Sequence, residues 1–94
     1  MNPRIEQLRQ AVENACECKG RHARSAAVIE GFKGQAVWDG VVETFDLEGH
    51  PKAKKCYAFH FVENGSPVIK TVLGIPPVDS PENAVRAAIA SKAR

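Results

Sequence analysis

The sequence has few of the features that mark specialised classes of protein. Its 94 residues include one tryptophan, one tyrosine and three cysteines. An odd cysteine count argues against a secreted disulfide framework, which normally uses an even one. No apolar run approaches the roughly 20 residues that a membrane span needs, and the first residues lack the apolar stretch of a signal peptide. We therefore expect one compact domain, residues 1–94, in a reducing bacterial-type cytoplasm and without a membrane partner.

The charge of the chain is nearly balanced. Thirteen basic residues against eleven acidic ones give a formal net charge of +2. Dedicated nucleic-acid-binding domains usually concentrate positive charge on one face, so this balance alone does not indicate nucleic acid. The 44% of hydrophobic and 26% of charged residues are typical of a globular domain. Composition therefore specifies no class of function.

Helical patterns mark both ends of the chain. Pro3 suits the first position of a helix that we expect over residues 3–19, with Gly20 as its C-terminal stop. Ser80 can cap a second helix that begins at Pro81 and whose small residues permit close approach to a sheet. The stripes expected to be buried are Ile5, Leu8, Val12, Ala15 and Cys16 in the first helix and Ala84, Val85, Ala88 and Ile89 in the second.

Four strands are expected between the helices. They cover residues 24–32, 35–47, 54–62 and 68–75. Gly34 is a natural turn and Gly40 a natural bulge, and residues 63–66 carry a strong hairpin signal. The predicted order is therefore α-β-β-β-β-α. This is an α+β fold, in which we expect a twisted four-stranded antiparallel sheet with both helices packed on one face.

The predicted second and fourth strands are apolar on both faces. In the fourth strand, Val68 and Val72 lie opposite Ile69 and Leu73. Two helices on one face would leave the other apolar face uncovered, and a large exposed apolar patch usually marks an interface. We therefore expect a homodimer through sheet residues. The alternative is a bulge at Gly40 that merges the apolar residues of the second strand onto one face.

Several clusters of reactive residues are better explained as structure. Cys16, Cys18 and His22 offer three metal ligands, but two cysteines separated by one residue on a helix point apart, whereas structural zinc sites use pairs such as C-x2-C. Cys56 and His60 are four strand positions apart, about 13 Å. At that distance neither could activate the other. We expect no metal and no cofactor.

A pocket or an interface is expected around the single tryptophan. Trp38, Val42, Asp39 and His60 are the residues that we expect to line either a dimer face or a small apolar pocket. Asp39 and Glu43 are too far apart along a strand to act as a paired acid and base. Either of them, or His60, could still act singly, which leaves a small-molecule enzyme as one alternative. Exposed strand charges that discourage aggregation explain the carboxylates more simply.

Two segments resemble nucleic-acid-binding families. Residues 55–61 resemble the aromatic strand motif of RNA-recognition motifs, although that fold has the order βαββαβ. Residues 48–55 are similar to the first hairpin loop of double-stranded-RNA-binding domains, whose α-β-β-β-α order is also similar. The basic cluster that those domains place at the start of the last helix is missing here. This resemblance implies a nucleic-acid-binding alternative that uses His50, Lys52, Lys54 and Lys55.

A third resemblance covers more of the chain. Residues 37–43, 49–54 and 75–81 look like those of small bacterial proteins without an assigned activity, some of which travel on mobile gene cassettes. This resemblance implies a bacterial cytoplasmic setting, and it implies no reaction, cofactor or catalytic residue. The sequence therefore favours a non-catalytic binding or interaction module, expected to be a homodimer.

Overall fold

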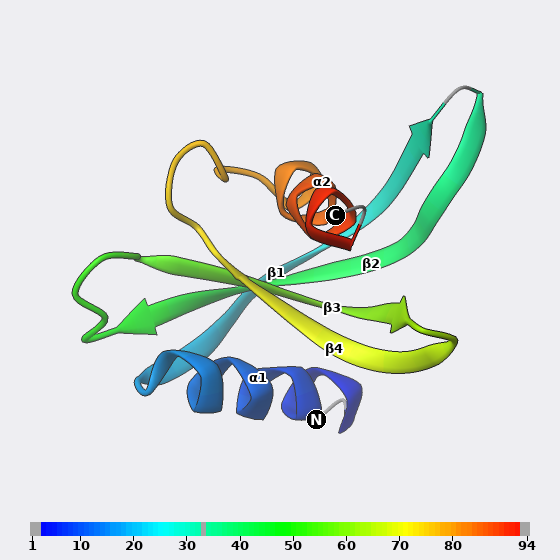
Figure 1. Ribbon diagram of the computed structural model, residues 1–94. Coiled ribbons are helices and arrows are strands. Elements are labelled where there is room, and N and C mark those ends of the chain that lie inside the picture. Colours follow the sequence, from blue (N-terminus) through cyan, green and yellow to red (C-terminus); the bar gives the residue numbers. More distant parts are fainter. Residues whose placement is uncertain (1–2, 33, 93–94) are drawn as a thin grey trace.

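The fold was analysed in a computed structural model, in which the described residues are 3–32 and 34–92. The chain forms α1 (Pro3–Cys16), β1 (Lys19–Phe32), β2 (Gln35–Glu48), β3 (Lys55–Glu63), β4 (Ser66–Leu73) and α2 (Pro81–Lys92). All strands belong to one antiparallel sheet in the order β1-β2-β3-β4 (Figure 1). The predicted α+β fold and its order of elements are thus confirmed. Within the described residues, no helix has the length and apolarity needed to cross a membrane.

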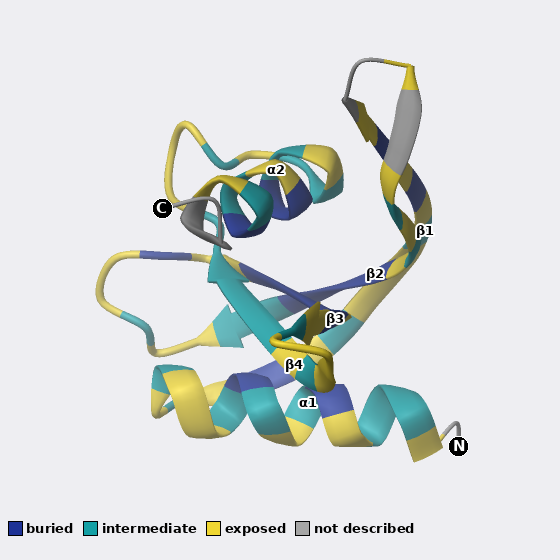
Figure 2. Cartoon of the chain, turned by 45° about the vertical axis from the view of Figure 1, so that its right-hand side comes forward, coloured by how far each residue is buried: buried dark blue, intermediate teal, exposed yellow. Residues whose placement is uncertain are grey.

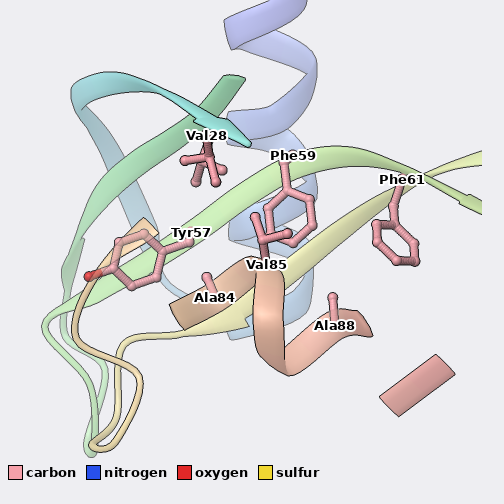
Figure 3. Packing of buried hydrophobic residues seen from close by; sticks show 8 residues of the cluster. Val28, Tyr57, Phe59, Phe61, Ala84, Val85 and Ala88 are labelled. Carbon is pink, nitrogen blue, oxygen red and sulfur yellow. The ribbon is translucent and has the colours of Figure 1, made fainter. Parts of the chain in front are cut away.

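The two helices lie on opposite faces of the sheet, which corrects the prediction that both pack on one face (Figure 1). Leu8 and Val12 of α1 pack against Phe45, Cys56 and Ala58. On the other face, α2 completes a core formed by Val28, Val42, Tyr57, Phe59, Phe61, Ala84, Val85 and Ala88 (Figure 3). Because the strands are apolar on both sides, each face buries its side chains under a separate helix. An uncovered apolar face therefore no longer argues for a second subunit.

The end of α1 also differs from the prediction. The helix ends at Cys16 because Glu17 adopts a positive φ of 53°. Glu13 holds this turn, since its carbonyl oxygen accepts the Glu17 N–H and its carboxylate Oε2 accepts the Gly20 N–H, both at 2.9 Å. Gly20 is not a helix stop but a buried residue of β1, where a Cβ atom would lie 3.3 Å from Cγ1 of Val12. This glycine lets the first strand pack closely on α1.

Both predicted turns are present, but the predicted bulge is not. Asn64 and Gly65 join β3 to β4 with φ values of 53° and 78°, the positive values that a tight two-residue hairpin requires. Gly34, with a φ of 79°, lies in the turn between β1 and β2. Gly40 pairs in register with Val28, and the irregularities of this ladder lie toward the two ends of β1.

The sheet divides into two hairpins. Strands β2 and β3 pair only over residues 43–46 and 55–58. In contrast, β1 pairs with β2, and β3 with β4, up to the turns that connect them. Beyond that short ladder the hairpins diverge, and β1–β2 extends away from β3–β4 (Figures 1 and 2). The divergence shapes the candidate functional site.

Candidate functional site

A cleft opens between the two hairpins where β2 and β3 separate. It consists of two hollows of about 350 Å³ and 190 Å³ that share Trp38, Asp39 and His60. We refer to it as the inter-hairpin cleft. The remaining lining residues are Val37, Phe61, Val62 and Pro67 in the larger hollow and Arg4, Gly40 and Val41 in the smaller one.

The structure brings together three of the four residues that the sequence suggested for a pocket or dimer face. Trp38 and Asp39 come from β2 and His60 comes from β3, and all three line the inter-hairpin cleft. Val42 does not reach the cleft. It is fully buried, because it lies where α2 covers β2.

Trp38 links the two hairpins across the cleft. Its Nε1 donates to the backbone carbonyl of His60 at 3.1 Å, so a side chain connects strands that share no ladder at this level. The indole meets the ring of Phe59 edge to face, with 5.4 Å between centroids. It also lies over Gly40, where a Cβ atom would come within 2.9 Å of Cη2 of Trp38. Gly40 therefore provides the space that the indole occupies, which is the physical reason for a glycine here without a bulge.

Exposed apolar side chains surround the cleft on one face of the sheet. Val37 and Val41 alternate with their neighbours in β2 and therefore share a face with Phe45, which packs on α1. Cross-strand pairing adds Ile29 opposite Asp39 and Ile69 opposite His60. Among the described residues, all of the large exposed hydrophobic side chains except Ile75 lie on this face. We refer to these five as the exposed apolar face: Ile29, Val37, Val41, Val62 and Ile69.

A buried carboxylate lies between α1 and the sheet. The side chain of Glu43 is 1% exposed. Its Oε2 accepts a hydrogen bond from Nη2 of Arg4 at 2.8 Å. Its Oε1 lies 2.7 Å from Nε2 of His22 and accepts a hydrogen bond from the Ser25 hydroxyl. Because a buried charge is tolerated only when it is paired, this network joins α1 to β1 and β2.

The Ser25, His22 and Glu43 group does not have the geometry of a catalytic triad. In a triad the acid and the serine contact opposite nitrogens of the imidazole. Here Nε2 of His22 is the nitrogen that faces both Glu43 and, at 3.4 Å, the Ser25 hydroxyl. Glu43 also lies outside the cleft, and both of its carboxylate oxygens have hydrogen-bond partners.

The cysteines occupy structural positions. Cys56 is buried, and its thiol donates to the carbonyl of Tyr57 at 3.8 Å. Burial raises the pKa of the Cys56 thiol well above its usual range, which disfavours a thiolate nucleophile. Cys16 packs against the same cluster, and Cys18 is half-buried between α1 and β1. In the part of the chain that the structure describes, no group of three or more His, Cys, Asp or Glu side chains could hold a metal ion.

The basic loop between β2 and β3 is organised by its histidine. Nδ1 of His50 accepts the N–H groups of Lys52 and Ala53 at 3.1 Å and 2.9 Å. His50 therefore stabilises the loop. It does not line the hollow that contains Lys52, Lys54 and Lys55. The structure thus places the three predicted lysines around one hollow, whereas the predicted histidine contacts the backbone of the loop and does not line the hollow.

No family model matches the sequence, and no curated protein or solved structure matches it significantly. The resemblances drawn from the sequence therefore stay predictions.

Proposed function

We propose that this chain is a non-catalytic interaction module that forms a homodimer through the inter-hairpin cleft and the exposed apolar face. One observation carries the proposal. In the described part of the chain, residues 38–41 of β2 pair with β1 only, and residues 37–41 include two of the five side chains of the exposed apolar face, Val37 and Val41. An uncovered strand edge is a template for another strand. A contiguous exposed apolar patch usually marks an interface.

A second copy of the chain suits this surface. A two-fold axis pairs identical strand segments in antiparallel orientation, so residues 37–41 of two copies are complementary to each other. The charged residues at the rim of the cleft are also compatible with a two-fold dimer. Asp39 is an acid, and Arg4, whose side chain is 39% exposed, and His60 are bases beside it. In a two-fold contact the acid of each copy can face a base of the other copy.

Neither face of the sheet is wholly uncovered, because α1 packs on one face and α2 packs on the other. The proposal depends on the part of the α1 face that lies beyond the helix. There Ile29 remains 69% exposed and Val37 remains 50% exposed. Such exposure is costly for a large apolar side chain, and burial of these residues in a dimer would favour association.

Sedimentation velocity of the wild type and two matched variants tests the proposal. Val41 and Ile75 are both 36% exposed, but only Val41 belongs to the exposed apolar face. We expect the wild type to sediment as a dimer. Val41→Asp should weaken the dimer by at least about tenfold, because it places an unpaired charge in the interface. Ile75→Asp should leave the dimer intact.

Two results would overturn the proposed homodimer. The first is a wild type that stays monomeric at every concentration measured. The second is equal dissociation by Val41→Asp and Ile75→Asp. Far-ultraviolet circular dichroism of both variants would establish that they are folded.

A further inference from the structure

A third hollow lies at the opposite end of the sheet from the inter-hairpin cleft. Its volume is about 390 Å³, and its lining residues come from the β2–β3 loop, β3 and the connection from β4 to α2. The loop and the connection lie at the same end of the sheet (Figure 1). We refer to it as the basic hollow. Its lining residues are Lys52, Lys54, Lys55, Tyr57, Gly74, Pro76, Val78 and Asp79.

The lysines of the basic hollow lack carboxylate partners. Lys52, Lys54 and Lys55 are exposed, and none of them forms an ion pair with any residue that the structure describes. Some other cations among the described residues are paired, for example Lys70 with Glu63 at 2.6 Å. Three ammonium groups on one short segment repel one another, and a bound anion would relieve this repulsion.

The segment that carries the lysines is held in place. Nδ1 of His50 accepts two backbone N–H groups of the loop. The carbonyl of Lys54 accepts the Leu47 N–H at 2.8 Å, and the carbonyl of Lys55 accepts the Gly74 N–H at 2.8 Å. A Cβ atom at Gly74 would lie 3.1 Å from the Lys55 carbonyl oxygen, so the glycine allows this close approach. A preformed segment loses less conformational freedom when it binds a ligand.

The other walls of the basic hollow are apolar, with one carboxylate. Tyr57, Pro76 and Val78 supply the apolar surface, and the Tyr57 hydroxyl points away from Val85 toward the connection between β4 and α2 (Figure 3). Burial, together with the nearby carboxylate of Asp79, raises the pKa of Tyr57, so the hydroxyl keeps its proton and can donate. Asp79 itself accepts a hydrogen bond from the Asn83 amide at 2.8 Å.

We propose that the basic hollow binds the phosphate of a nucleotide. Lys52, Lys54 and Lys55 would contact the phosphate oxygens, the apolar wall would receive a flat ring, and Asp79 would accept from hydroxyl or amino donors of the sugar or base. Free nucleotides and the backbone of a nucleic acid both offer this phosphate chemistry. The site is separate from the homodimer surface and does not depend on it.

Nuclear magnetic resonance titration tests the site directly. Amide shifts of the uniformly ¹⁵N-labelled protein would be followed during addition of three probes: inorganic pyrophosphate, ADP, and a short single-stranded RNA. We expect the shifts to concentrate in residues 52–57 and 74–79. Lys54→Gln should weaken binding roughly two- to fivefold, the range for one exposed ion pair. Lys19→Gln removes the same charge from an exposed position in β1, outside the hollow, and should leave the affinity unchanged.

Each outcome has a defined meaning. Pyrophosphate or ADP shifts that depend on Lys54 and not on Lys19 would support a free nucleotide as the ligand. RNA binding with the same lysine dependence, without ADP binding and with an affinity that falls as salt rises, would support a nucleic-acid backbone as the source of the phosphate. The proposal would be overturned by an absence of shifts with all three probes, or by equal weakening in both variants.

Discussion

The buried ion pair between Arg4 and Glu43 offers a quantitative test of how α1 is held on the sheet. The guanidinium is 39% exposed, whereas the carboxylate is 1% exposed. The two partners should therefore respond unequally to substitution. Arg4→Met leaves a buried carboxylate with only His22 and Ser25 as partners, whereas Glu43→Gln leaves a guanidinium that water can solvate.

The expected magnitudes follow from this difference. Loss of one partner from a fully buried ion pair costs about 3–5 kcal/mol. Since two partners of Glu43 remain, we expect Arg4→Met to lower the free energy of unfolding by about 2–3 kcal/mol. We expect Glu43→Gln, whose amide can still form hydrogen bonds, to cost about 1–2 kcal/mol. The double variant should lose less than the sum, with a coupling energy of about 1–2 kcal/mol.

Urea unfolding measures these free energies, and the fluorescence of Trp38, the single tryptophan, reports the transition. Arg9→Met is a matched control on the same helix, because Arg9 pairs with Glu6 and Glu13 near the surface. It should cost much less than Arg4→Met, since exposed ion pairs contribute little. A coupling energy below about 0.5 kcal/mol would refute the reasoning. Equal losses from the two arginine variants would refute it as well.

Three further variants test local packing. Gly40→Ala places a methyl group against the Trp38 ring, so we expect a changed emission spectrum and a loss of about 1–3 kcal/mol in unfolding free energy; an unchanged spectrum would mean that the ring lies elsewhere. The buried Thr44 hydroxyl has no hydrogen-bond partner among the described residues. Thr44→Val should therefore raise the unfolding free energy by about 1 kcal/mol, and a decrease would show that the hydroxyl is bonded. Because burial raises the pKa of Cys56, a variant that keeps only this cysteine should react with a disulfide reagent at about pH 8 only after unfolding. Rapid labelling of the folded protein would contradict the burial.

Features that depend on neighbouring residues were predictable from the sequence. Ser80 caps α2, since its hydroxyl accepts the Asn83 N–H at 3.2 Å. The turn at Asn64 and Gly65 forms where predicted, because both residues tolerate positive φ. Each of these signals lies within four residues of the structure that it specifies. The four strands and two helices were therefore recognisable without knowledge of the tertiary fold.

Features that depend on distant residues were not predictable in the same way. Apolar residues on both faces of the strands are compatible with helices on either side, and the side taken by α1 depends on the turn at Glu17. The partners of Glu43 come from positions as far away as Arg4, 39 residues along the chain. A single sequence gives no signal for that convergence, beyond the position of Glu43 among strongly apolar residues of β2.

The grouping of Trp38, Asp39 and His60 lies between these cases. The sequence suggested that these residues line a dimer face or a small apolar pocket. The structure groups them where the pairing of β2 with β3 has ended, with the indole of Trp38 as the link. A binding role for the three residues stays a prediction.

The most direct test of the homodimer is an isotope-filtered nuclear Overhauser experiment on a mixed sample of ¹³C-labelled and unlabelled protein, in which only contacts between copies are detected. A dimer through the exposed apolar face predicts intermolecular contacts from the methyl groups of Ile29, Val37 and Val41. Intermolecular contacts confined to Ile75 and the α2 surface would contradict it, as would the absence of any contact between copies.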